Sequence, residues 1–142
     1  MSYLARMGEA ALRKLTGNKT LTISWITPYL AVGDEVDASL RSELLKAGIT
    51  ITVDVRKCFD NAMNPIYDEI YALRCILPVE KYVDQYKILI HCQGGIDRSP
   101  FFAACYLWGI SKTGESLMDC YERVKKARPQ TMIHDEWVRM FE

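Results

Sequence analysis

Hydrophobic and polar positions change periodicity along the chain, and these changes predict an order of elements. Apolar residues spaced three and four apart predict helices over 3–15, 36–47, 99–111, 114–127 and 134–141. Short apolar or β-branched runs predict strands within 21–33, with a bend at Pro28, and over 49–55, 70–77 and 87–91. The last run, KILIH, shows no alternation, which is typical of a strand covered on both faces. We therefore expect an α/β domain with a central, largely parallel sheet flanked by helices.

Composition and charge narrow the class of protein. The 142 residues suit one compact domain, which we expect over 21–142, with 1–20 as an amphipathic helix packed on it. The 18 basic and 18 acidic residues cancel, so nothing favours nucleic acid or an anionic membrane as a partner. No run approaches the ~18 apolar residues of a membrane span, and residues 1–17 lack a secretory signal. We expect a soluble, cytoplasmic monomer.

The five cysteines are odd in number, widely spaced and without a C-x-x-C pair. This pattern argues against a disulfide framework or a zinc site. Cys105 and Cys120 lie on apolar helix faces and Cys75 in an apolar strand, so we expect these three in the core. Cys92 stands apart because it follows the most apolar strand and precedes two glycines.

The segment HCQGGIDRSP, residues 91–100, passes from that strand into a helix. Gly94 and Gly95 allow positive φ angles, so successive N–H groups can point into one concavity that binds an anion. Ser99 and Pro100 begin the next helix, whose positive dipole end points at the same place. The sequence therefore predicts a phosphate site at the carboxyl edge of the sheet.

Two residues of this segment supply chemistry. Arg98 offers a planar fork of donors that can bind two phosphate oxygens. Cys92 lies at the floor of the loop, where the helix N-terminus and the guanidinium favour a thiolate over a thiol. A thiolate beneath a bound tetrahedral dianion is arranged for in-line attack on a phosphate ester. The alternative interpretation of Cys92 is a buried structural thiol.

The sequence resembles the cysteine-dependent tyrosine and dual-specificity protein phosphatases. Their signature H-C-x-x-G-x-x-R-[S/T] is matched by His91, Cys92, Gly95, Arg98 and Ser99. The segments WITPYLAVGDEVDA, LLKAGITITVDV, YERVKKARP and EWVRMF also resemble, in order, those of small dual-specificity phosphatases from about residue 21 to the C-terminus.

The resemblance implies a role for each matched residue. Cys92 would form a phosphocysteine intermediate, Arg98 would bind the phosphate and the transition state, and Ser99 would hydrogen-bond the sulfur as it leaves. His91 would orient the loop and help to keep Cys92 ionised. The phosphate would also contact the loop residues Gln93, Gly94, Gly95, Ile96 and Asp97. The resemblance implies a phosphoprotein substrate, no metal and no organic cofactor.

The family's general acid, usually an Asp on the loop before the motif strand, has no direct match. That loop is LPVEKYVDQYK, and Lys81 falls about where the Asp is expected. Glu80 lies near the carboxyl ends of the strands and is our first candidate. Asp84 lies near the start of the motif strand, and five residues at ~3.3 Å each put it ~16 Å from the sulfur. This distance is why we prefer Glu80 to Asp84. Asp60, on the loop after residues 49–55, is the second candidate.

Other polar residues receive less specific interpretations. We expect Asp97 to face outward, toward a positive group on the substrate or the loop. Lys125, Lys126 and Arg128 are expected on a solvated helix face, with substrate docking as the alternative. His134 has no partner visible in the sequence and is expected to start a helix.

The leading functional hypothesis is a protein phosphatase acting on phosphotyrosine, with phosphoserine and phosphothreonine as further substrates. Phosphatases of RNA 5′-triphosphate ends or phosphoinositides are alternatives, although the variable loop positions carry no lysine for extra phosphates. A non-catalytic phosphate-binding module is a third hypothesis, which the unmatched acid motivates and the intact Cys92 and Arg98 oppose. A disulfide between Cys58 and Cys92 under oxidation, as in some relatives, is a further hypothesis.

Overall fold

The computed structural model describes residues 3–56, 86–111 and 113–141. The strand expected over 70–77 lies outside these residues. The described elements are α1 (Tyr3–Thr16), β1 (Ser24–Thr27), β2 (Leu30–Gly33), α2 (Glu35–Ser39), α3 (Arg41–Lys46), β3 (Ile49–Asp54), β4 (Lys87–His91), α5 (Arg98–Ile110), α6 (Leu117–Ala127) and α7 (Asp135–Phe141). None of the helices in these ranges is long and apolar enough to cross a bilayer.

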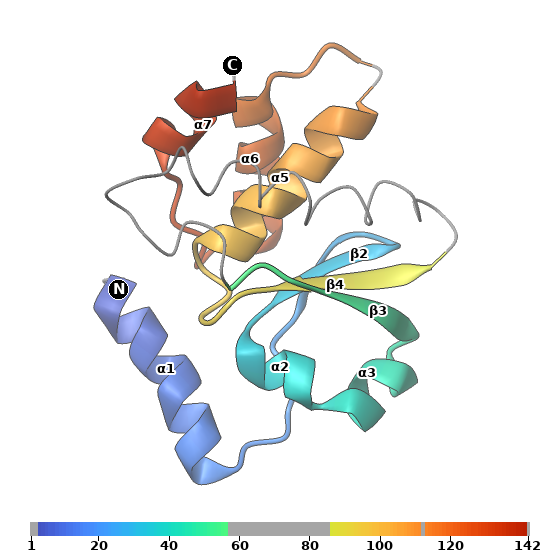
Figure 1. The fold of residues 1–142 in the computed structure, drawn as a ribbon, viewed down its shortest axis with the longest axis vertical. Coiled ribbons are helices and arrows are strands. Elements are labelled where there is room, and N and C mark those ends of the chain that lie inside the picture. Colours follow the sequence, from blue (N-terminus) through green and yellow to red (C-terminus); the bar gives the residue numbers. More distant parts are fainter. Residues whose placement is uncertain (1–2, 57–85, 112, 142) are drawn as a thin grey trace.

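The strands form a sheet in the order β1-β2-β4-β3 (Figure 1). β2 and β3 run parallel to β4, and β1 pairs antiparallel with β2. The register places Gly33 and Asp54 on either side of His91, so three strands end together at one edge. Cys92 follows at that edge. The prediction of a largely parallel sheet flanked by helices is confirmed.

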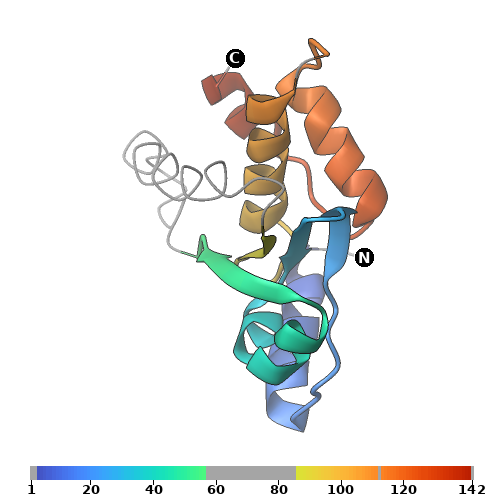
Figure 2. The same cartoon turned by 90° about the vertical axis from the view of Figure 1, so that its right-hand side faces the viewer.

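Helices cover both faces of the sheet (Figures 1 and 2). Ile88 and Ile90 of β4 join the larger core cluster with α5, α6 and α7, whereas Leu89 joins a smaller cluster with Leu44 of α3. All three β4 residues are at most 2% exposed. This double burial explains why the sequence of β4 is apolar without alternation, as predicted.

The single helix expected over 36–47 is instead two short helices, α2 and α3. Leu40 separates them with φ −88° and ψ 64°, outside the helical region. Its N–H donates to the carbonyl of Asp37 three residues back, and its own carbonyl accepts from the N–H of Leu44. Leu40 therefore ends α2 and begins α3, while the apolar spacing continues through both. Periodicity alone does not detect such a break.

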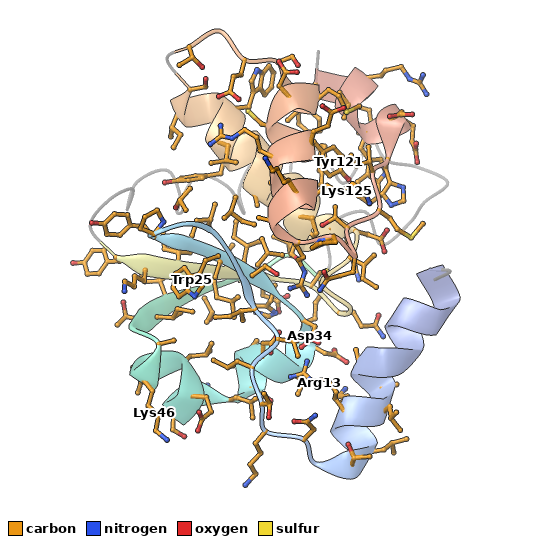
Figure 3. The ribbon with its side chains drawn as sticks, turned by 180° about the vertical axis from the view of Figure 1, so that it is seen from behind. Arg13, Trp25, Asp34, Lys46, Tyr121 and Lys125 are labelled. Carbon is orange, nitrogen blue, oxygen red and sulfur yellow. The ribbon has the colours of Figure 1, made fainter. Side chains whose placement is uncertain are left out.

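The N-terminal helix α1 contacts the domain through a buried arginine (Figure 3). The Arg13 guanidinium pairs with Asp34 and with Asp37, the latter at 3.1 Å, and donates to the hydroxyl of Thr22 at 2.8 Å. Asp34 and Asp37 also cap α2, each carboxylate accepting from the other residue's backbone N–H. Burial and the adjacent Asp37 raise the pKa of Asp34, and Arg13 opposes this rise.

Candidate active site

Cys92 lies directly after β4 and is 2% exposed. Two groups contact its sulfur. The backbone N–H of Gly95 donates to Sγ at 3.2 Å, and the Oγ of Ser99 lies 3.2 Å from Sγ. The sulfur thus accepts a hydrogen bond from the loop and lies beside a hydroxyl of the first turn of the following helix.

The Ser99 hydroxyl has two neighbours. Its Oγ lies 3.2 Å from the Cys92 sulfur and 3.3 Å from the carbonyl oxygen of Gly33, at the end of β2. A hydroxyl carries one proton, so it donates to one of these groups at a time. A thiolate competes for that proton better than a neutral carbonyl, because charge strengthens the hydrogen bond.

Gly95 is the position in the loop where only glycine fits. Its φ is +67°, and a Cβ there would lie 2.8 Å from the carbonyl oxygen of Gly33 and 2.5 Å from an Arg128 nitrogen. Gly94, in contrast, does not adopt a positive φ. The prediction that both glycines use this conformation is therefore wrong for Gly94, because one left-handed residue is sufficient to turn this loop.

Helix α5 begins at Arg98, so its positive end faces the loop. The half-buried Arg98 side chain donates to the backbone carbonyl of Arg56, just beyond β3. This contact ties the start of α5 to the neighbouring parallel strand. The guanidinium therefore lies at the sheet edge where the loop residues also gather.

His91 precedes Cys92 and is 5% exposed. Its Nδ1 is buried without a hydrogen-bond partner among the residues that the structure describes. Burial lowers the pKa of His91, Asp54 opposes this, and Arg56 adds to it. A ring that is neutral at neutral pH adds no positive charge beside the sulfur.

Arg128 is a residue of this site that our sequence interpretation missed. It is 2% exposed, not solvated as predicted, whereas Lys125 and Lys126 are exposed as expected. Its Nε donates to the carbonyl of Gly95 at 2.6 Å, and its Nη1 bonds oxygens of β1, β2 and the segment before β1. The signal in the sequence was its spacing, four residues after Val124 on the buried face of α6.

The connection between α6 and α7 also holds the outer side of the loop. The backbone N–H of Met132 donates to the carbonyl of Ile96 at 2.9 Å. The imidazole Nε2 of His134 lies 2.5 Å from a carboxylate oxygen of Asp97. Asp97 thus faces a titratable partner on the α6–α7 connection, not on the substrate or the loop as expected. His134 lies at the start of α7, as predicted, and its carbonyl accepts from the N–H groups of Trp137 and Val138. Its Asp97 partner lies 37 residues away, which is why the sequence did not indicate it.

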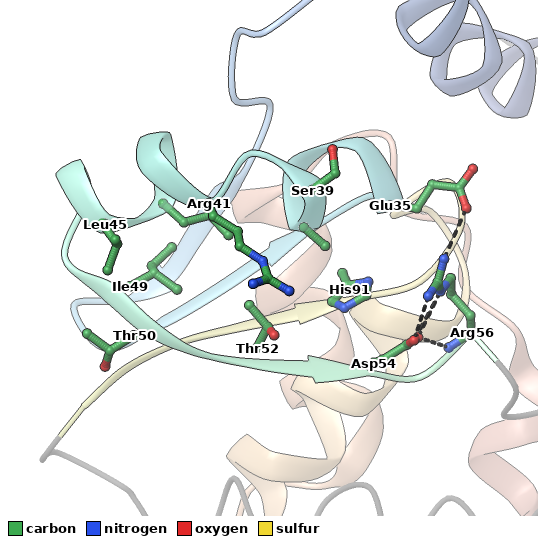
Figure 4. Close-up of a pocket in the computed structure, with 12 residues that line it drawn as sticks. Glu35, Ser39, Arg41, Leu45, Ile49, Thr50, Thr52, Asp54, Arg56 and His91 are labelled. Atoms are coloured by element: carbon green, nitrogen blue, oxygen red, sulfur yellow. Dashed lines mark hydrogen bonds and ion pairs between the residues drawn. The ribbon is translucent and has the colours of Figure 1, made fainter.

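A cavity of about 580 Å³ lies between α2, α3 and β3, with Arg41, Thr52 and His91 among its lining residues (Figure 4). At its end near the loop, Arg56 pairs with Asp54 at 2.8 Å and with Glu35 at 3.5 Å. Burial raises the pKa of Asp54, but hydrogen bonds from Arg56 outweigh this and lower the pKa below its usual value. His91 lines this cavity and also precedes Cys92 in the chain.

Several predicted residues fall outside the described part of the chain. Glu80 and Asp60, the candidate general acids, lie there, as do Cys58 and Cys75. These assignments stay predictions. Cys105 and Cys120 are described, and both are buried in the larger core cluster, as expected. Within the three described ranges, no cluster of three or more His, Cys, Asp or Glu side chains could hold a metal ion.

Comparison with solved structures shows which proteins share this fold. A mouse protein described as a dual specificity phosphatase, in complex with zinc tungstate, superposes with a TM-score of 0.71 at 23% identity, over 87% of each chain. Human DUSP28 gives 0.69 at 21% identity, over 84% of this chain and 94% of its own. The human tyrosine phosphatase-like serine/threonine/tyrosine-interacting protein gives 0.60 at 22% identity, over 82% and 91%. At these identities the likeness establishes the fold.

The sequence itself establishes the family. A comparison with curated proteins gave no match. The sequence model of the family "Dual specificity phosphatase, catalytic domain" matches residues 51–141, which include the whole Cys92 loop. The resemblance seen in the sequence is confirmed: the chain belongs to the dual-specificity phosphatase family of cysteine-dependent phosphatases.

Proposed function

We propose that the protein hydrolyses phosphotyrosine in phosphoproteins, with phosphoserine and phosphothreonine as further substrates, and that Cys92 is its nucleophile. The observation that carries this proposal is the contact set of the sulfur: it lies between the Gly95 N–H and the Ser99 hydroxyl at the N-terminus of α5. This arrangement favours a nucleophilic thiolate where an anion also binds.

In the first step the Cys92 thiolate attacks phosphorus, forming the S–P bond as the P–O ester bond breaks. The leaving oxygen takes a proton from a general acid, for which Glu80 is our first candidate and Asp60 our second. Arg98 and backbone N–H groups of residues 93–97 bind the equatorial oxygens, where negative charge is carried in the transition state. The product alcohol leaves, and the phosphoryl group stays on sulfur.

In the second step water attacks phosphorus and the S–P bond breaks. Inorganic phosphate and the Cys92 thiolate form, with the proton of water passing to the base form of the same acid. The Ser99 hydroxyl donates to the sulfur as negative charge returns to it. The 3.2 Å separation of the two atoms supports this role.

The test is hydrolysis of an aryl phosphate and of a phosphotyrosine peptide, without added metal, by wild type and by Cys92→Ser. Cys105→Ser is the matched control, since Cys105 is a buried thiol in the middle of α5. We expect turnover by wild type and the control and none by Cys92→Ser. Phosphate binding without turnover in wild type would instead identify a phosphate-binding module.

A further inference from the structure

Asp97 occupies the N-cap position of α5 but does not cap the helix. Aspartate is among the preferred N-cap residues because its carboxylate accepts from the free N–H groups of the first turn. Here the side chain makes no capping hydrogen bond. Its carboxylate oxygen lies instead 2.5 Å from Nε2 of His134. In the same protein, the aspartates at the start of α2 and the serine at the start of α6 do cap their helices.

This difference matters because of where α5 begins. The first two residues of its first turn, Arg98 and Ser99, adjoin the loop above Cys92, the place proposed for the substrate's phosphoryl group. A carboxylate in its usual capping position would turn toward the N–H of Ser99, since Pro100 has none, and would add negative charge where a dianion must bind. The loop therefore contains its own competing anion, one residue before Arg98.

We propose that His134 is a positioning residue for the phosphate-binding loop: by holding the Asp97 carboxylate, it keeps the N-terminus of α5 open for the phosphoryl group. The inference rests on the proposed function of this loop. His134 does not contact the reacting atoms and acts only through Asp97.

The surroundings of His134 suit this role. Its ring stacks on Trp137, with centroids 4.0 Å apart and planes 19° from parallel. Its Nδ1 lies 3.2 Å from the Glu136 carboxylate, and its backbone N–H donates to the Tyr121 hydroxyl. Thus Asp97 from the loop and Glu136 from α7 are the charged groups that face the ring, with the Tyr121 hydroxyl at its backbone. Both carboxylates favour the imidazolium.

The protonation state follows from this geometry. Although burial opposes it, the hydrogen bond and charge of Asp97 raise the pKa of His134, and Glu136 adds to the rise. His134 is therefore charged at and below its ordinary value of 6.5 and loses its charge as pH rises through the raised value. Its hold on Asp97 is stronger on the acidic side.

The test is the dissociation constant of inorganic phosphate, read from backbone amide shifts, together with kcat and KM for an aryl phosphate. His134→Phe keeps a ring for Trp137 but cannot bind Asp97. We expect phosphate binding and KM to weaken by roughly 2- to 30-fold, the range that a carboxylate cap is worth. Asp135→Asn, an exposed change in the first turn of α7 that leaves the Asp97 and Glu136 contacts of His134 in place, is the control and should stay within about twofold.

Asp97→Ala separates this role from a structural one. Once the carboxylate is removed, His134 has nothing to hold, so His134→Phe should have no effect on phosphate binding in the Asp97→Ala background. The difference in phosphate affinity between wild type and His134→Phe should also become smaller as the pH rises above the pKa of His134, because His134 of the wild type then loses its charge. Phosphate itself titrates, so variants are compared at each pH.

Two results overturn the inference. One is an unchanged phosphate affinity in His134→Phe with wild-type turnover intact, which leaves the proposed function standing. The other is an equal loss of affinity with and without Asp97, which assigns His134 a structural role. If the wild-type protein neither hydrolyses substrate nor binds phosphate, the proposed function is wrong, and the inference about His134 is wrong with it.

Discussion

The β4–α5 loop and the α6–α7 connection meet at the same site, but only the residues of the loop can be identified from a sequence signature. Residues 91–99 carry the family signature, and two of them contact the Cys92 sulfur: Gly95 through its N–H and Ser99 through its hydroxyl. The connection has no signature, yet it holds three successive loop residues through Arg128, Met132 and His134. One segment supplies the chemistry and the other fixes its geometry.

The two arginines show this difference most clearly. Arg98 is half-buried and lies at the open edge of the sheet, where it can reach a ligand. Arg128 is buried, and among the described residues its guanidinium donates to oxygens of Gly95, Thr22, Ser24 and Val32. Removing Arg98 should therefore affect turnover, whereas removing Arg128 should affect the fold first. The following changes test this contrast, from the largest effect to the smallest.

Arg128→Met should destabilise the protein by about 3–5 kcal/mol, since it leaves several buried acceptors without a donor. Burial lowers the pKa of Arg128, and the carboxylates of Asp37 and Asp34 oppose this. Denaturant unfolding measures the effect. Lys126→Met, on the exposed face of the same helix, should stay within about 0.5 kcal/mol. Equal effects of the two changes would contradict the assignment of Arg128 to the interior.

Arg98→Lys should lower kcat/KM for an aryl phosphate by about 10²–10³-fold, because a point charge replaces a fork of donors at the transition state. Steady-state kinetics measures it, and unfolding experiments should show little change in stability. Arg123→Lys, at an exposed position of α6, is the control and should keep wild-type kinetics. Full activity in Arg98→Lys would remove the proposed role.

Ser99→Ala should slow the breakdown of the phosphocysteine, because the departing sulfur loses its donor. A hydrogen bond to a charged group is worth about 1.5–3 kcal/mol, so we expect roughly 10- to 100-fold. Rapid-quench kinetics should then show a burst of product alcohol followed by slow turnover. Ser99→Thr, which restores a hydroxyl, should recover most of the rate. If Ser99→Ala slowed formation of the phosphocysteine as much as its hydrolysis, this role of Ser99 would be contradicted.

The two histidines of the chain should titrate on opposite sides of the ordinary value of 6.5, which ring NMR signals can follow separately. Burial favours neutral His91, so its contribution to stability is present above 6.5 and is lost as pH falls toward its lowered pKa. His134 gains carboxylate partners, so its contribution is present below 6.5 and is lost as pH rises through its raised pKa. His91→Asn and His134→Asn should tilt the stability profile in opposite directions. A tilt of the same sign would contradict one of the two environments.

Much of the fold was predictable because it rests on local patterns. The apolar run of β4, the turn at Pro28 and the amphipathic spacing of α6 each identify an element without knowledge of its neighbours. The break at Leu40 was not predictable, since the apolar spacing passes through it unchanged. A single residue outside the helical φ/ψ region does not change the spacing of the apolar residues around it.

The sequence by itself determined the chemistry: a cysteine, an arginine and a serine at family spacing between an apolar strand and a helix. Only the tertiary structure decided that Arg128 lies inside, that Gly95 alone takes the left-handed turn, and that Asp97 meets His134. The reason is physical. The signature residues follow one another along one loop, whereas the residues that position this loop come from other segments that pack against it. Such contacts depend on the fold and not on spacing in the sequence.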